Sequence, residues 1–325
     1  MKDPQDRSAR LGQIVALVGP SGCGKSGVAL ELAPRLNGEI VTVDSMQVYR
    51  GMDIGTAKPG GADQARVRHH LIDLLELYQA FDAAAFCEVA VPLIEALRAG
   101  GKTPILCGGT GFYFTALQGG VAAAPAGDPG LRRELEKASL NLLLEELQRL
   151  DPRAYEAIDR NNRRRVVRAV EVVRLTGRPF SQPRPAVLPA GLECGWRDAS
   201  CWQVFGLRRE PEDLKTRIGN RVEAMFERGL VAETRQLLAA GLAGNRTAMQ
   251  AIGYRQVVDY LRGDRSLAET KELIKSKTRQ LARKQMTWFR RQMRVTWVDV
   301  GAEESDLQIA ARIERLFFGT AHGIF

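Results

Sequence analysis

The sequence feature that most constrains the fold is a glycine-rich loop close to the start of the chain. It has the form G-x-x-x-x-G-K-[ST] and consists of Gly19, Pro20, Ser21, Gly22, Cys23, Gly24, Lys25 and Ser26. Residues 13–18 before it are mostly apolar and β-branched, whereas residues 27–36 after it are rich in Ala and Leu. We therefore predict a buried strand, a phosphate-binding loop and a helix in succession, which is the setting in which this motif binds phosphate.

Each part of this loop has a physical role toward an anion. The glycines let backbone N–H groups approach phosphate oxygens, and the following helix presents its positive end to the same anion. Lys25 adds a positive charge, and the Ser26 hydroxyl is a candidate ligand of Mg²⁺. The alternative is a glycine-rich turn without a ligand. The loop alone does not indicate which phosphate compound binds, or whether a phosphoryl bond is broken.

The size of the chain indicates a large α/β domain with an insertion or a second domain, and its charge is compatible with a polyanionic partner. A chain of 325 residues is long for one domain. Its formal net charge is +9 and its pI is about 9.5. Such a balance fits nucleic acid as partner. The net charge alone is equally consistent with a basic surface that contacts only water and binds no nucleic acid.

The cysteines and the hydropathy pattern indicate a cytoplasmic protein. Five cysteines are scattered without a C-x-x-C pair, namely Cys23, Cys87, Cys107, Cys194 and Cys201. An odd count without paired spacing favours reduced thiols and argues against a zinc module. No apolar run has the length needed to span a membrane, and no signal-peptide core follows the first ten residues.

Asp44 follows a second predicted strand, residues 39–43. In doubly wound sheets the ligand site gathers at the carboxyl ends of the strands, so we expect Asp44 one strand over from the phosphate loop, at the same edge. A carboxylate at that place can serve as a metal ligand or as a general base. The alternative is a residue that only caps a helix or a turn.

Two further segments are candidates for the same site. Residues 48–59 are interrupted by glycines and predict an ordered loop beside the ligand. Residues 108–111, Gly-Gly-Thr-Gly, follow a third predicted strand and either cradle a ligand or pack tightly. His69 and His70 are adjacent on a short predicted strand, so they point to opposite sides and favour structural roles over a shared metal.

The composition and the periodicity of the sequence change near residue 120. Residues 119–129 have the composition of a linker, and the stretches that follow have helical periodicity. We predict a mostly helical insertion domain over residues 120–200. Residues 1–119 and 201–325 would then form the α/β body, whose C-terminal part is helical.

Arginines are densest at residues 163–168. Arg164 and Arg168 fall on one face of a predicted helix, and guanidinium groups match phosphate oxygens well. The alternative is a solvated face with ion pairs to Glu171. A second basic stretch, residues 277–291, interleaves with Trp288 and Phe289, which suits a nucleic-acid surface or, alternatively, a core helix with a basic exterior.

Together these residues resemble the tRNA dimethylallyltransferase (isopentenyltransferase) family. The resemblance covers nearly the whole chain. It rests on the phosphate loop and on residues 44–59, 69–73, 108–113, 163–168, 176–181, 250–256 and 283–290. The segment 44–59, DSMQVYRGMDIGTAKP, is long and specific.

The resemblance implies a P-loop NTPase-like parallel sheet flanked by helices, with a mostly helical insertion domain. It implies transfer of a dimethylallyl group from dimethylallyl diphosphate to the exocyclic amine of the tRNA adenosine 3′ of the anticodon. The implied partners are the anticodon stem-loop of tRNA, dimethylallyl diphosphate and Mg²⁺ at Ser26. We expect a monomer without a membrane partner. The target base must leave its stack before its amine can reach a buried electrophile.

The resemblance also assigns roles to residues. Asp44 and Lys25 are the implied catalytic residues, Asp44 as the base that accepts the amine proton. The phosphate loop from Gly19 to Ser26, with Arg217 and Arg221, is the implied diphosphate site. The implied tRNA contacts are Asp44, Ser45, Met46, Gln47, Thr110, Arg132, Arg164, Arg165, Val166, Val167, Arg168, Gln250, Ala251, Ile252, Gly253, Tyr254 and Arg255.

The chain departs from the family pattern in a few places. Ser21 stands where Thr is usual, and residues 74–81 replace a segment that usually contains proline. The C-terminal zinc-finger extension of eukaryotic members is absent from this sequence, so the resemblance implies an enzyme of the bacterial type. Three other functions remain as alternatives: a small-molecule P-loop kinase, an isopentenyltransferase acting on free adenine nucleotides, and a tRNA-binding module with a vestigial loop.

Overall fold

A computed structural model describes residues 13–119, 121–122, 125, 127–182, 186–187 and 201–319. Contacts within the chain divide it into two compact units. Residues 120–188 form the smaller unit, and residues 1–119 with 189–325 form the larger one, called the body below. The insertion was predicted over residues 120–200, but residues 188–200, which include Cys194, lie outside the described part.

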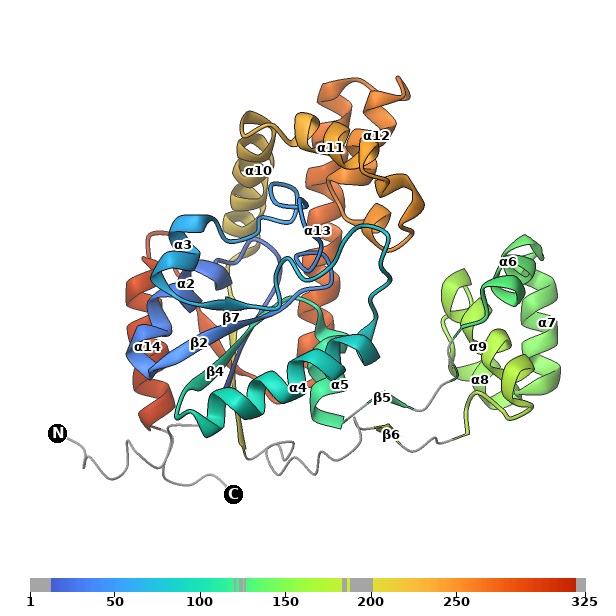
Figure 1. The fold of residues 1–325 in the computed structure, drawn as a ribbon, viewed down its shortest axis with the longest axis horizontal. Helices are drawn as coiled ribbons and strands as arrows, with labels where there is room; N and C mark the ends of the chain where they lie inside the picture. The colour runs from blue at the N-terminus through green and yellow to red at the C-terminus, as the bar shows by residue number, and fades with distance from the viewer. Residues whose placement is uncertain are drawn as a thin grey trace. The chain divides into compact units, whose positions relative to one another are not determined.

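The body is built on a six-stranded sheet (Figure 1). All pairings in this sheet are parallel, which confirms the predicted parallel sheet. The strand order is β3-β2-β4-β1-β7-β8. The strands are β1 (Ile14–Val18), β2 (Gly38–Val43), β3 (His69–His70), β4 (Thr103–Gly108), β7 (Trp202–Arg208) and β8 (Thr296–Asp299).

This order corrects one expectation. β4 lies between β1 and β2, so Asp44 follows the second strand away from the phosphate loop and not the adjacent one. The strand between them contributes residues 108–111, the glycine-rich segment, at its carboxyl end. The three neighbouring strands β2, β4 and β1 therefore bring three loops to one edge of the sheet.

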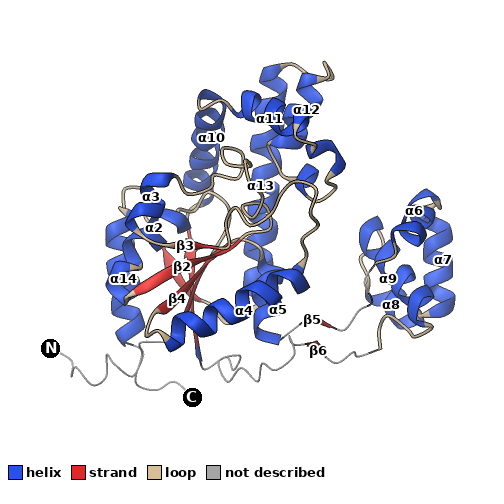
Figure 2. Ribbon diagram, viewed as in Figure 1, coloured by secondary structure: helices blue, strands red, loops and turns tan. Residues whose placement is uncertain are grey.

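The sheet is buried because its central strands are apolar on both faces. Every residue of β1 and β4 is buried. Val15 and Leu17 share one core cluster with side chains of α2 (Lys25–Leu32) and α14 (Asp306–Gly319). Helices α4 (Ala83–Ala99) and α5 (Gly111–Gly119) pack against each other, and α4 also packs against β4 (Figure 2). The loops that follow β1, β2 and β4 gather at the carboxyl edge of the strands.

The helical part of the body follows β7. It consists of α10 (Pro211–Glu227), α11 (Leu230–Ala239), α12 (Tyr254–Leu261) and α13 (Leu267–Gln292). Ser266 and Glu269 form a capping box that starts α13. This long helix contacts α10, α12 and α5, so it joins the helical part to the sheet (Figure 1).

The smaller unit is helical, in keeping with the sequence pattern. Its helices are α6 (Pro129–Lys137), α7 (Leu140–Leu150), α8 (Pro152–Ala157) and α9 (Arg163–Thr176). Gly177 ends α9 with a φ of 65°, the left-handed conformation that favours glycine at a helix end. The short strands β5 (Val121–Ala122) and β6 (Ala186–Val187) pair antiparallel.

The sequence reasoning missed several helices of the body. They are α3 (Gly61–Arg66), α5 and α14. Helix α14 has apolar Ile309, Ile313 and Phe317 at helical spacing, all fully buried. Its omission matters because its first residue, Asp306, lies in the candidate site.

Candidate active site

The phosphate loop adopts the conformation that its glycines allow. Gly22 and Gly24 have φ values of 89° and 101°, which other residues rarely adopt. Helix α2 then begins at Lys25, so its positive end faces the loop. The Lys25 ammonium donates to the carbonyl oxygens of Gly19 and Pro20, both at 2.9 Å. The loop is thus organised around the residue that carries its charge.

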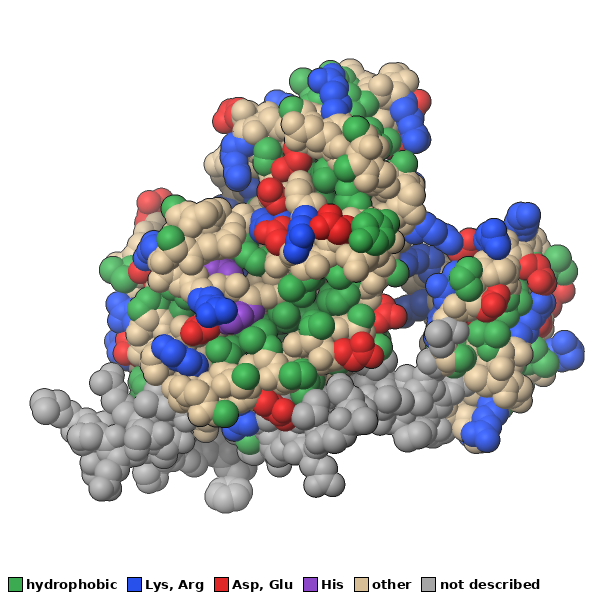
Figure 3. All heavy atoms as spheres, in the orientation of Figure 1, with side chains coloured by type: hydrophobic (Ala, Val, Ile, Leu, Met, Phe, Trp, Pro, Cys, Tyr) green, Lys and Arg blue, Asp and Glu red, His purple; other side chains and the backbone are tan. Residues whose placement is uncertain are grey.

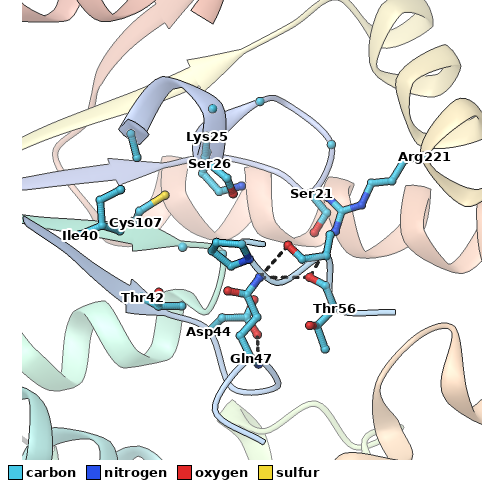
Figure 4. A pocket seen from close by; sticks show the side chains of 18 of the residues that line it. Ser21, Lys25, Ser26, Ile40, Thr42, Asp44, Gln47, Thr56, Cys107 and Arg221 are labelled. Atoms are coloured by element: carbon cyan, nitrogen blue, oxygen red, sulfur yellow. Dashed lines mark hydrogen bonds between the residues drawn. The ribbon is translucent and has the colours of Figure 1, made fainter. Parts of the chain in front are cut away.

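A cavity of about 530 Å³ opens beside this loop (Figure 4). Seven of the predicted diphosphate-binding residues line it, namely Ser21, Gly22, Gly24, Lys25, Ser26, Arg217 and Arg221. Gly19, Pro20 and Cys23 shape the loop without being among the lining residues. From the other loops, the cavity is lined by Asp44, Gln47, Thr56, Ala57, Pro59, Gly108 and Gly109. Parts of the chain that are far apart in sequence thus form one site.

Asp44 is held by its own turn. Its Oδ1 accepts the backbone N–H groups of Met46, at 2.8 Å, and Gln47, at 3.2 Å. This is the turn role that was considered as an alternative, yet the carboxylate also lines the cavity. Asp44 therefore both stabilises its turn and lines the cavity, and the turn fixes the direction of the carboxylate.

Two arginines on α10 bring positive charge to the cavity, one helical turn apart. Arg217 donates to the carbonyl oxygen of Gly22 at 3.2 Å. Arg221 extends from α10 toward Thr56 and Asp44 (Figure 4). Burial lowers the pKa of Arg221 below its ordinary value, and the nearby Asp44 opposes this change. A half-buried cation that lines a cavity is suited to an anionic ligand.

Residues 44–59 form an ordered loop at the rim of the cavity. The buried Lys58 ammonium binds the carboxylates of Asp53, at 2.6 Å, and Asp73, at 2.5 Å. The Glu233 carboxylate accepts the Ile54 N–H at 2.8 Å and the Tyr254 hydroxyl at 2.6 Å. Burial and the adjacent Glu233 raise the pKa of Tyr254. These contacts tie the loop to α11 and α12.

Asp306 is an acid that the sequence reasoning did not single out. It lines the cavity, and its Oδ2 lies so close to Gly27 that a Cβ there would be 1.9 Å away. Burial raises the pKa of Asp306 above its ordinary value of 3.8, although Arg217 and Arg209 counteract this effect. The carboxylate form therefore opposes folding at neutral pH.

We expect Asp306→Asn to raise the melting temperature at pH 7. Because the folded-state pKa is raised, folding favours the neutral carboxyl, and this contribution is lost as the pH rises through the folded-state pKa. The rise in melting temperature caused by the substitution should shrink as the pH is lowered. It should vanish near pH 3.8, the ordinary pKa of an aspartate. Thermal unfolding of both proteins between about pH 4 and 8 measures this. The control is Glu303→Gln at an exposed position. A lower melting temperature at pH 7 would instead mean that attraction to the arginines dominates.

The donor chemistry of the cavity is compatible with Mg²⁺. Ser26 offers a hydroxyl and Asp44 a carboxylate, and both residues line the same cavity. Among the described residues, no group of three or more His, Cys, Asp or Glu side chains could hold a metal ion. A Mg²⁺ ion would therefore take most of its ligands from phosphate oxygens and water, which is common for this ion.

The predicted tRNA contacts in the body divide by exposure. Thr110 accepts the Ser45 N–H at 3.2 Å and so joins two of the three loops. Gln250 and Arg255 are exposed, whereas Ala251, Gly253 and Tyr254 are buried and Ile252, Ser45 and Met46 are half-buried. The buried side chains can shape a binding surface but cannot themselves contact RNA.

The aromatic ring of Phe289, in the basic stretch 277–291, is fully buried against Phe114. The nucleic-acid interpretation is therefore wrong for this ring.

In the smaller unit, the predicted contacts also play two different parts. Val166 and Val167 belong to the apolar core of the unit. Arg132 and Arg168 both bind the buried carboxylate of Glu171, at 2.5 and 2.6 Å. Burial acts to raise the pKa of Glu171, but these hydrogen bonds outweigh it and lower the pKa. Arg164 and Arg165 are exposed. Figure 3 shows basic and acidic side chains interspersed on this unit.

Sequence reasoning also missed several lining residues. They are Ala29, Ile40, Thr42, His69, Cys107, Asn220, Gln285 and Asp306. Some of these residues lie on β2, β3 or β4 near the carboxyl edge of the sheet, and this position could have indicated them.

The Cys107 thiol is not a nucleophile at neutral pH, because burial raises its pKa to about 12. No disulfide joins the described cysteines, Cys23, Cys87, Cys107 and Cys201.

Comparison with known proteins places this geometry in context. Residues 47–292 match the family described as "IPP transferase". The chain is 45% identical over 291 residues to the tRNA dimethylallyltransferase of Geobacter metallireducens, covering 88% of this chain and 92% of that protein. A relative from Citrifermentans bemidjiense, tRNA dimethylallyltransferase 1, is 43% identical over 297 residues, covering 91% and 94%. The crystal structure of the tRNA isopentenylpyrophosphate transferase of Bacillus halodurans has a TM-score of 0.68 at 38% identity, covering 94% of this chain and 96% of that one.

Proposed function

The chain belongs to the IPP transferase family, and from this premise we propose that it is a tRNA dimethylallyltransferase. It transfers a dimethylallyl group from dimethylallyl diphosphate to the exocyclic N6 amine of an adenosine in tRNA. The target is the adenosine 3′ of the anticodon, within the anticodon stem-loop. The observation that carries this proposal is that one cavity is lined by both the phosphate loop and Asp44.

The reaction is one substitution at carbon. The adenosine N6 attacks C1 of the dimethylallyl group, the bond from C1 to the diphosphate oxygen breaks, and diphosphate leaves with the electron pair. Asp44 accepts the proton that the amine loses, through the Oδ2 oxygen that its turn directs. The adenine amine is a weak nucleophile because its lone pair is delocalised into the ring, so proton removal assists bond formation.

The leaving diphosphate is stabilised by fixed positive charge. Lys25 and Arg221 supply cationic groups, and the backbone N–H groups of the phosphate loop supply dipoles. Arg217 joins them from the next turn of α10. Mg²⁺ held by Ser26 and the diphosphate oxygens would neutralise further charge as the leaving group departs.

The tRNA is held by arginine contacts to phosphate and by the loops around Asp44. Arg164 and Arg165 are exposed on α9. Arg255 is exposed on α12, and Gln250 is exposed shortly before that helix. The pair formed by Arg132 and Arg168 offers guanidinium groups whose positions are fixed by Glu171. The target base leaves its stack to reach the cavity. We propose that the protein acts as a monomer in the cytoplasm. None of its described helices is long and apolar enough to cross a membrane.

Label transfer tests the function directly. The protein is incubated with Mg²⁺ and dimethylallyl diphosphate labelled in the prenyl group, together with tRNA, AMP or no acceptor. Label in tRNA at the adenosine 3′ of the anticodon is the expected result. Label in AMP alone would identify an enzyme for free nucleotides. Turnover of ATP without prenyl transfer would identify a kinase, and tRNA binding without either reaction would identify a binding module.

We expect Arg165→Ala to weaken tRNA binding in a salt-dependent way. An exposed arginine that contacts phosphate releases about one counterion, so the slope of log affinity against log salt should fall by about one. Binding to tRNA is measured between about 50 and 200 mM salt. The control is Lys102→Ala, because Lys102 precedes β4 and lies at the opposite edge of the sheet from the cavity. A slope equal to that of the wild type would place Arg165 outside the interface.

A further inference from the structure

The side chain of Gln285 connects two of the loops that form the cavity. It projects from α13, and its Oε1 accepts the Ser21 backbone N–H at 2.8 Å and the Ser21 hydroxyl at 3.1 Å. Its Nε2 donates to the carbonyl oxygen of Gly109 at 3.0 Å. The reversed orientation would set an NH₂ group against an N–H and an oxygen against a carbonyl, so the partners define the amide orientation.

The two loops bound by Gln285 have different tasks in the proposed reaction. Ser21 belongs to the loop that holds the diphosphate. Gly109 precedes Thr110, whose backbone N–H donates to Val43 at 3.3 Å and whose hydroxyl accepts the Ser45 N–H at 3.2 Å. Val43 and Ser45 flank Asp44. Gln285 thus links the phosphate loop to the segment Gly109–Thr110, whose hydrogen bonds hold the two residues that flank Asp44.

The glycine-rich segment lies so close to α13 that a side chain at Gly109 or Gly111 would clash with the helix. A Cβ at Gly109 would lie 2.4 Å from the Gln285 Nε2, and a Cβ at Gly111 would lie 2.3 Å from the Trp288 ring. Gln285 and Trp288 are three residues apart, so they share one face of the helix. The two glycines let this segment approach the helix closely.

We propose that Gln285 is a positioning residue that sets the separation between the diphosphate site and Asp44. This inference rests on the proposed function. Gln285 is bonded to the loop backbones, and the reacting atoms are held by the loops themselves. Its effect should appear in the chemical step, because a displacement of about 1 Å between reacting groups can cost about a hundredfold in rate.

Gln285→Leu removes all three hydrogen bonds while keeping a side chain of similar size. We expect its single-turnover rate with labelled dimethylallyl diphosphate to fall about 30- to 100-fold. The affinities for tRNA and for the diphosphate should stay within about threefold of the wild type, since the charged groups remain. The control is Gln280→Leu, an exposed glutamine on the same helix, which should react at the wild-type rate.

Gln285→Glu separates a positioning role from a role in packing. The carboxylate keeps an acceptor for Ser21 but sets an oxygen against the Gly109 carbonyl. The protonated carboxyl can donate to that carbonyl, as the amide does. The ratio of its rate to that of the wild type should therefore rise as the pH is lowered toward the pKa of the introduced carboxyl. A pH-independent ratio would contradict a role for the bond to Gly109.

A second measurement does not depend on the reaction. Hydrogen exchange of the Thr110 amide should be faster in Gln285→Leu than in the wild type and in Gln280→Leu, at an unchanged melting temperature. Unchanged exchange, a single-turnover rate within about threefold of the wild type, or a loss confined to diphosphate affinity would each overturn the inference. A wild-type protein that transfers no prenyl group would instead overturn the proposed function, and the exchange measurement would still decide whether Gln285 holds the segment.

Discussion

Asp44→Asn is expected to lower the rate of prenyl transfer by at least about a hundredfold, the usual contribution of a general base. Asparagine retains an Oδ1 that can accept the N–H groups of Met46 and Gln47, so the turn should persist. The amide cannot accept the proton that the adenosine amine loses. The loss should therefore appear in the single-turnover rate, while the affinity for tRNA stays within about threefold of the wild type.

The measurement compares the wild type, Asp44→Asn and Asp44→Ala under identical conditions. Alanine removes both the proton acceptor and the turn, so it should be at least as slow and should lower the melting temperature as well. Asp63→Asn, in the short helix α3, is the control for loss of one negative charge. A wild-type rate in Asp44→Asn would remove this residue from the role of base.

Lys25→Ala should have an effect of similar or greater size. As the carbon–oxygen bond breaks, negative charge develops on the diphosphate oxygen that was bonded to C1, and a fixed donor at such a position contributes about 10²- to 10³-fold. We expect kcat/KM for dimethylallyl diphosphate to fall by this factor and the binding of inorganic pyrophosphate to weaken. Affinity for tRNA should change little, because the predicted tRNA contacts lie on other segments.

Lys25 also donates to the carbonyl oxygens of Gly19 and Pro20, so the variant must be checked for stability. A melting temperature close to the wild-type value would assign the loss to charge. Lys102→Ala again serves as the control for removal of a lysine outside the cavity. If Lys25→Ala kept the wild-type kcat/KM, the phosphate loop would not be the diphosphate site.

Local patterns predicted the parts of the site that depend on adjacent residues. The phosphate loop is contiguous, and its glycine spacing carries the conformation that the structure shows. Asp44 could be assigned to the same edge of the sheet because it ends a parallel strand. Arg217 and Arg221 could be paired because a helix brings residues four apart to one face.

The rest depended on contacts between distant parts of the chain. Gln285 meets Ser21 across 264 positions, and no spacing rule connects them. The position of β4 between β1 and β2 follows from strand pairing, to which the order of strands along the sequence is only a weak guide. The ion pair of Arg168 with Glu171 was visible as an alternative at helical spacing. The complete burial of Glu171, which makes the pair a fixed element, depends on how α6 packs against α9.

The pairing of β5 with β6 has a consequence for the modular construction of the molecule. Because Val121 pairs with Val187 in antiparallel fashion, the chain enters and leaves the smaller unit at neighbouring points. An insertion with adjacent ends can be exchanged, lengthened or replaced by a tight turn without rerouting its host. Given the tRNA contacts proposed for this unit, selection can therefore change how the enzyme binds its RNA while the residues of the cavity stay the same.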